Sequence, residues 1–166
     1  MAVVYDVAAD WSYADHDPQV IKDAGYKVAL RYLGNDGRCL TFQERDDIYR
    51  VGLRLAVIGQ RGAVARPRSG YPGGREDGAF YQAEADEMGI PNHKPILCAI
   101  ADVGDGFPQY SDIGAIKEYF RGIWETNRRP IGIYGPYWVL EEFRNDPRVF
   151  CYWQTAGASG SGSGTG

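Results

Sequence analysis

The feature that most constrains the fold is a nearly unbroken apolar run over residues 96–102, which ends on the carboxylate of Asp102. Alternating apolar and polar residues are typical of a strand with one face in water. A continuous apolar run instead indicates a strand buried on both faces, as in parallel sheets covered by helices. In β/α folds, catalytic and binding groups gather at the carboxyl ends of such strands. Asp102 is therefore the first candidate functional residue.

Five other apolar runs have the length of strands, at residues 3–7, 27–33, 53–58, 130–134 and 149–153. Helical segments separate them. Asp17 followed by Pro18 predicts the start of a helix that ends near residue 24, and Thr41 with Glu44 three residues later predicts a capping box. Further helices are expected over residues 79–88, 112–126 and 137–143. This alternation predicts a parallel α/β fold, and both an open doubly wound sheet and a closed barrel fit it.

Residues 59–78 contain six glycines and two prolines, and we expect them to form a long loop. A loop of this length in a compact domain is usually functional or mobile. Since it follows the third predicted strand, we hypothesise that it acts as a lid or a partner-binding loop. It also carries the cluster Arg61, Arg66 and Arg68, which we interpret as solvated loop residues in preference to a phosphate site.

Composition argues against several classes of function. The net charge of −4 with dispersed basic residues gives no footprint for nucleic acid, and no apolar stretch is long enough to span a membrane. Three cysteines do not make a disulfide framework. His16 and His93 lack the spacing of metal ligands, and no glycine-rich nucleotide-binding loop follows the first predicted strand, so we expect neither a metal nor a cofactor.

The chain divides into one domain and a tail. Residues 1–156 have the length and apolar content of a single globular domain. Residues 157–166 are almost entirely Ser and Gly, a composition typical of a flexible linker. No charged segment followed by an apolar one opens the chain, so no signal peptide is expected.

If the six strands share one rim, their carboxyl ends collect acids, aromatic rings and amides. The acids are Asp6, Asp102 and Asp105. The candidate substrate-binding residues are Trp11, Arg31, Tyr32, Gln60, Tyr134, Trp153 and Gln154. Such a set suits a sugar site, in which carboxylates act on the glycosidic bond and aromatic faces stack on the rings. Each residue also has a structural interpretation: Asp6 and Asp105 as turn residues, Trp153 as a core side chain.

The motifs at these strand ends resemble a known family. They read Val-Tyr-Asp6, Ala-Leu-Arg-Tyr-Leu-Gly34, Ala-Ile-Ala-Asp102, Gly-Ile-Tyr-Gly135 and Tyr-Trp-Gln-Thr155. Their order over most of residues 2–156 is similar to that of the glycoside-hydrolase-like domain family related to the family 25 lysozymes. That family occurs in actinobacterial proteins and bacteriophages. The resemblance implies a TIM-type (β/α) barrel, here truncated to about six β/α units, around a bacterial cell-wall glycan site.

The resemblance also implies roles for the acids. Asp6 matches the acid on the first strand, and Asp102 matches the first member of an Asp-x-Glu pair on the fourth. Gly104 stands where that Glu is expected, and Asp105 is one position displaced. Two hypotheses follow: a muramidase-like hydrolase using Asp102 with Asp6 or Asp105, or a non-catalytic glycan-binding or structural module. Either fits a phage lysin or a virion tail protein that meets the host cell wall and contacts other virion proteins through the linker.

Overall fold

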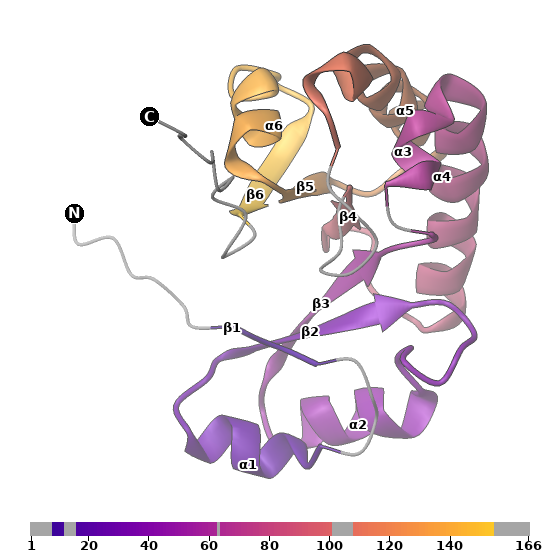
Figure 1. Cartoon of the computed structure of the whole chain (residues 1–166). Coiled ribbons are helices and arrows are strands. Elements are labelled where there is room, and N and C mark those ends of the chain that lie inside the picture. The colour runs from indigo at the N-terminus through magenta and orange to yellow at the C-terminus, as the bar shows by residue number, and fades with distance from the viewer. Residues whose placement is uncertain (1–7, 12–15, 63, 101–107, 155–166) are drawn as a thin grey trace, which may run out of the picture.

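The computed structural model describes residues 8–11, 16–62, 64–100 and 108–154 (Figure 1). Six strands form one sheet, and each pairs in parallel with the next along the chain. They are β1 (Ala8–Asp10), β2 (Val28–Leu33), β3 (Arg54–Gly59), β4 (Ile96–Ala99), β5 (Ile131–Gly135) and β6 (Val149–Gln154). The first strand expected from the sequence, residues 3–7, lies outside the described residues.

The helices form an arc around the outside of the curled sheet, whose concave side opens to the left in Figure 1. They are α1 (Pro18–Asp23), α2 (Phe42–Arg50), α3 (Ala65–Arg68), α4 (Gly70–Glu87), α5 (Ile113–Thr126) and α6 (Tyr137–Glu142), with a 3-10 turn at Tyr110–Asp112. The predicted helix starts are confirmed, because the side chains of Asp17 and Thr41 accept hydrogen bonds from the backbone N–H groups of Gln19 and Glu44. In a capping box the Glu44 side chain would accept the backbone N–H of Thr41, but here it accepts hydrogen bonds from Arg31.

The order of the strands decides between the two folds that the sequence left open. A doubly wound sheet reverses its strand order at one point and carries helices on both faces. Here the order runs from β1 to β6 without reversal, and the helices cover one face. The fold is therefore α/β with a six-stranded, parallel, curled half-barrel, consistent with a truncated TIM-like barrel.

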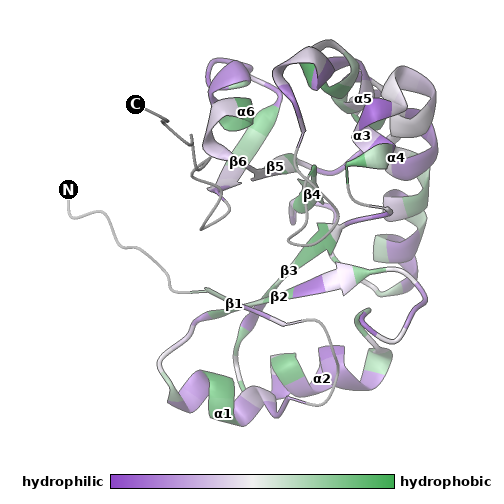
Figure 2. Cartoon of the chain, viewed as in Figure 1, coloured by the Kyte–Doolittle hydropathy of each residue, from purple (hydrophilic) through white to green (hydrophobic). Residues whose placement is uncertain are grey.

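Two apolar clusters lie on the two faces of the sheet. The larger one fills the space between the convex face and the helices, with Val57, Cys98 and Ile133 of the strands meeting Tyr81 and Phe120 of the helices. The smaller one lies on the concave face, around Leu30, Ile58, Leu97 and Ala99. In Figure 2, β3 carries hydrophobic colour, and hydrophobic and hydrophilic segments alternate along α1 and α2. None of the described helices is long and apolar enough to cross a membrane.

The prediction of a long loop over residues 59–78 is wrong. Gly59 ends β3, α3 follows, and α4 begins at Gly70. The glycines serve helix packing: a Cβ added at Gly74 would lie 1.8 Å from the carbonyl oxygen of Tyr119, and one at Gly78 would lie 2.8 Å from the Cα of Ile123. Gly74 and Gly78 thus let α4 approach α5 backbone to backbone. The helical backbone removes the basis for the mobile lid.

Candidate functional site

Three of the predicted sugar-binding aromatics meet on the concave face of the half-barrel. Tyr32 of β2, Tyr134 of β5 and Trp153 of β6 pack against the small apolar cluster there, close to the carboxyl ends of their strands. Tyr134 and Trp153 are register partners, and their ring centroids lie 4.6 Å apart at a tilt of 35°. The Tyr32 hydroxyl lies 3.4 Å from a carboxylate oxygen of Asp10, to which it donates. This surface combines aromatic faces with hydroxyl and carboxylate groups, the mixture that binding sites use to hold and orient a ligand.

Arg31 and Trp11 lie on the other side of the sheet. Arg31 is 0% exposed and donates from Nε and Nη2 to the two carboxylate oxygens of Glu44 at 2.7 and 3.0 Å. Trp11 is also buried, and its Nε1 donates to Glu44 Oε1 at 2.8 Å. Because successive side chains of a strand point to opposite faces, Arg31 is turned toward the helices while Tyr32 is turned inward. Arg31 and Trp11 thus hold α2 to the sheet.

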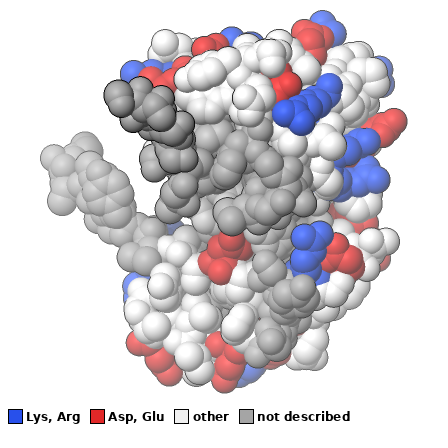
Figure 3. Space-filling model, viewed as in Figure 1, with Lys and Arg blue, Asp and Glu red and all other residues white. Residues whose placement is uncertain are grey.

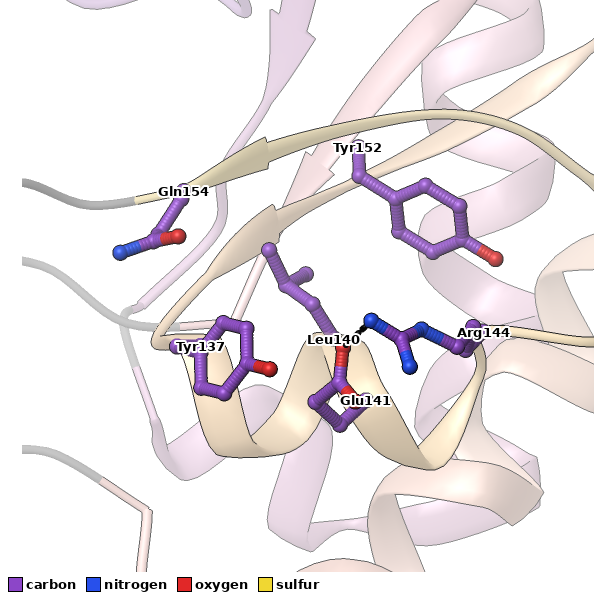
Figure 4. A pocket seen from close by; sticks show the side chains of 6 residues that line it. All are labelled: Tyr137, Leu140, Glu141, Arg144, Tyr152 and Gln154. Atoms are coloured by element: carbon purple, nitrogen blue, oxygen red, sulfur yellow. Dashed lines mark ion pairs between the residues drawn. The ribbon is translucent and has the colours of Figure 1, made fainter.

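Because successive side chains of β6 point to opposite faces of the sheet, Gln154 does not share the concave face with Trp153. Gln154 is exposed and lines a pocket of about 300 Å³ at the outer edge of β6, together with the other residues shown in Figure 4. The pocket contains the rings of Tyr137 and Tyr152 and the Arg144–Glu141 ion pair, 3.1 Å long. The remaining predicted amide, Gln60, directly follows β3 and is half-buried.

A second pocket lies at the carboxyl ends of β2 and β3. It measures about 370 Å³ and is lined by Gly34, Asn35, Asp36, Arg38, Cys39, Arg61, Gly62, Arg66 and Phe80; we call it the rim pocket. Arg38 lowers the pKa of Asp36 to about 2 through side-chain and backbone hydrogen bonds. Burial raises the pKa of the Cys39 thiol. At neutral pH the pocket therefore carries ionised Asp36 beside arginines and a protonated Cys39.

Asp77 of α4 anchors two of the three arginines of the rim pocket, a role that the sequence motifs did not indicate. The sequence predicts a solvated arginine cluster, but Arg61 and Arg66 both donate to Asp77, whose side chain is 0% exposed. The Tyr119 hydroxyl of α5 donates to the same carboxylate at 2.7 Å. Asp77 lies four residues before the buried Tyr81, and this helical spacing was the available signal that it faces inward. Assigning residues 59–78 to a loop concealed that spacing.

The predicted catalytic acids Asp6, Asp102 and Asp105, and Gly104, lie outside the described residues. Among the residues that are described, no three His, Cys, Asp or Glu side chains are grouped so that they could hold a metal ion. Acidic and basic side chains are interspersed over the face shown in Figure 3. The concave aromatic face and the rim pocket are thus the two candidate binding features near the carboxyl ends of the strands.

Solved structures of similar fold include a Tat-secreted protein, a glycosyl hydrolase 25 and an autolysin. The Tat-secreted protein Rv2525c of Mycobacterium tuberculosis aligns with a TM-score of 0.78 and 22% identity, over 92% of this chain and 80% of that one. GHIP, a glycosyl hydrolase 25 of Streptococcus pneumoniae, aligns with a TM-score of 0.57 and 14% identity, over 95% and 71%. The modular autolysin LytC of the same species, solved with a synthetic peptidoglycan ligand, aligns with a TM-score of 0.52 and 13% identity, over 81% and 33%. Because the sequence identities are this low, these alignments show a shared fold and nothing further.

No curated protein matches the chain. A family model does match: the Rv2525c-like, glycoside hydrolase-like domain, over residues 19–161. The matched residues cover strands β2 to β6, helices α2 to α6 and all of α1 except Pro18. They include the three aromatic residues of the concave face. The chain therefore belongs to the Rv2525c-like, glycoside hydrolase-like domain family.

Proposed function

We propose that this domain binds bacterial cell-wall glycan on the concave face of its half-barrel. The observation that carries the proposal is the placement of Tyr32, Tyr134 and Trp153 around one apolar cluster near the carboxyl ends of parallel strands, where β/α folds place their ligands. Stacked aromatic rings offer a flat apolar surface for a sugar ring, and Asp10 with the Tyr32 hydroxyl offers hydrogen bonds to its hydroxyl groups. Membership of a glycoside hydrolase-like family and the fold of a peptidoglycan-binding autolysin support the same ligand class.

Hydrolysis of that glycan is the second candidate function. Asp6 and Asp102 stand at positions that match acids of the related lysozymes, which favours retained chemistry. Gly104 stands in place of the expected general acid, a group whose raised pKa is central to glycosidic cleavage. In a hydrolase of this kind, Asp102 would act with Asp6 or Asp105. Without such a pair the domain is a binding or structural module.

The proposed place of action is outside the bacterial cell, at the wall. A protein of similar fold is described as Tat-secreted, which supports export. A phage lysin or a virion tail protein, joined to other virion proteins through residues 157–166, is a further proposal. It rests on the resemblance of the motifs and on the Ser/Gly composition of that segment.

Binding and hydrolysis are separated by measuring both on purified peptidoglycan. We expect the chain to sediment with the insoluble polymer and Trp153→Ala to lose most of that retention, because the substitution removes one of the stacked rings. Phe150→Ala is the matched control, since Phe150 is an aromatic of the same strand, is 62% exposed and lies outside the concave cluster. Release of reducing ends that disappears in Asp102→Asn would establish the hydrolase. Equal retention of Trp153→Ala and the unaltered chain would contradict binding on the concave face.

A further inference from the structure

We propose that the rim pocket is an anion-binding subsite in which Arg61 binds a carboxylate or phosphate group. This inference rests on the proposed function, because it places a charged group of the same cell-wall polymer beside the glycan site. The pocket volume of about 370 Å³ is within the range of about 300–1,000 Å³ that small-molecule sites occupy. Its position also fits, since Gly34 follows β2 directly and Arg61 follows Gln60 at the end of β3.

The pocket is built on a buried acid that holds two guanidinium groups. Asp77 receives hydrogen bonds from Arg61 Nη1 at 2.9 Å and from Arg66 Nε and Nη2 at 3.0 and 2.6 Å. A buried carboxylate is costly unless it is paired and hydrogen-bonded, and this one is fully satisfied by both arginines and the Tyr119 hydroxyl. The arrangement fixes two arginine side chains at the rim before any ligand arrives.

Three carboxylates pair with the three arginines of the pocket, and the arginines differ in how many of their N–H groups are already used. Arg61 and Arg66 share the single charge of Asp77, while Arg38 is paired with Asp36 at 2.9 Å. Glu76 also accepts from Arg66, but its side chain is 66% exposed, so water screens that pair. Arg66 is further committed to the carbonyl oxygen of Gly73. Arg61 is therefore the arginine with binding capacity to spare.

The geometry of Arg61 suits an oxyanion. Its guanidinium carbon lies 4.5 Å from the ring centroid of Phe80, which holds the plane of the group in place. Among the described residues its hydrogen bond runs through Nη1 to Asp77, which leaves the Nε and Nη2 edge for a ligand. That edge presents two parallel N–H groups, the fork that binds carboxylate or phosphate in a bidentate manner. The arginine side chain is 42% exposed and lines the pocket.

Small anions test the pocket without any glycan present. Inorganic phosphate and glutarate are titrated separately into the full chain, and the Nε–Hε signals of the arginines are followed by NMR. We expect the Arg61 signal to shift at millimolar anion, while that of Arg50 stays in place. Arg50 is the matched control because it is an exposed arginine paired with Asp47 on the surface of α2. A shift with phosphate alone indicates a phosphate-bearing wall polymer, and a shift with glutarate alone indicates the carboxylates of peptidoglycan. No shift of Arg61 with either anion would overturn the proposal.

Variants connect the pocket to binding of the wall. Arg61→Gln should lower retention on peptidoglycan several-fold and Arg50→Gln should not, although both remove one positive charge. Arg61→Gln leaves Asp77 paired with Arg66 and Tyr119, so the fold is expected to persist, and thermal unfolding checks this. If Trp153→Ala loses retention while Arg61→Gln keeps it, the anion subsite fails and the glycan proposal stands. If the anions shift Arg61 but the unaltered chain does not bind peptidoglycan, the glycan proposal fails and the anion site stands.

Discussion

At the scale of single residues, the direction of a side chain decides which predicted site residues share a surface. Arg31 and Tyr32 are neighbours in β2, and Trp153 and Gln154 are neighbours in β6, yet each pair is divided between the two faces of the sheet. The sequence motifs correctly placed all four near the ends of strands. The motifs did not show which of the four side chains share a face. Side chains alternate between the two faces along a strand, and a position near the rim does not distinguish the faces. Tyr32 and Trp153 therefore lie on the concave face, while Arg31 is buried against Glu44 on the opposite face.

The buried Arg31–Glu44 ion pair gives a prediction about stability. Replacing either residue alone, as in Arg31→Met or Glu44→Leu, should destabilise the fold by about 3–5 kcal/mol, because the partner becomes an unpaired buried charge. Combining the two should cost far less than the sum of the single effects. Urea unfolding of the four proteins measures this. Additive losses would contradict the account of Arg31 as the partner of Glu44.

At the scale of elements, most helices and strands could be predicted because their ends carry local signals. Gly25, Gly52 and Gly89 follow three of the helices with positive φ values of 94°, 79° and 64°, a conformation that glycine adopts readily. Residues 70–78 could not be predicted in this way. Their glycines indicate a loop by composition, but Gly74 and Gly78 allow the close approach of α5, a tertiary contact that no local pattern reports.

The packing of α4 on α5 therefore predicts opposite effects for two glycine-to-alanine substitutions. Gly74→Ala should destabilise the protein by about 1–3 kcal/mol, since its methyl group would overlap the backbone of Tyr119. Gly114→Ala, in the first turn of α5, meets nothing within 4 Å and should be neutral or stabilising by up to about 1 kcal/mol. Thermal unfolding compares the two variants. A harmless Gly74→Ala would show that α4 and α5 are not in backbone contact.

At the scale of the whole molecule, a sheet with consecutive strand order curls and so acquires an inside and an outside. The helices cover the outside (Figure 1). The concave face carries Tyr32, Tyr134 and Trp153. The alternation of strands and helices in the sequence predicted the parallel α/β class, but it fitted an open doubly wound sheet equally well. Strand order is a property of the folded chain, and it places aromatic residues of β2, β5 and β6 against one apolar cluster.

The central claim is that cell-wall glycan binds to this concave face, and the indole signals of the four tryptophans test it most directly. Soluble peptidoglycan fragments are titrated into the chain, and the indole N–H groups are followed by NMR, with Trp153→Phe to assign one signal. We expect the Trp153 signal to shift. Those of Trp11, hydrogen-bonded to Glu44, and Trp124, whose Nε1 is buried, should stay in place. A Trp153 signal that does not move at fragment concentrations that saturate retention on the polymer would contradict the account.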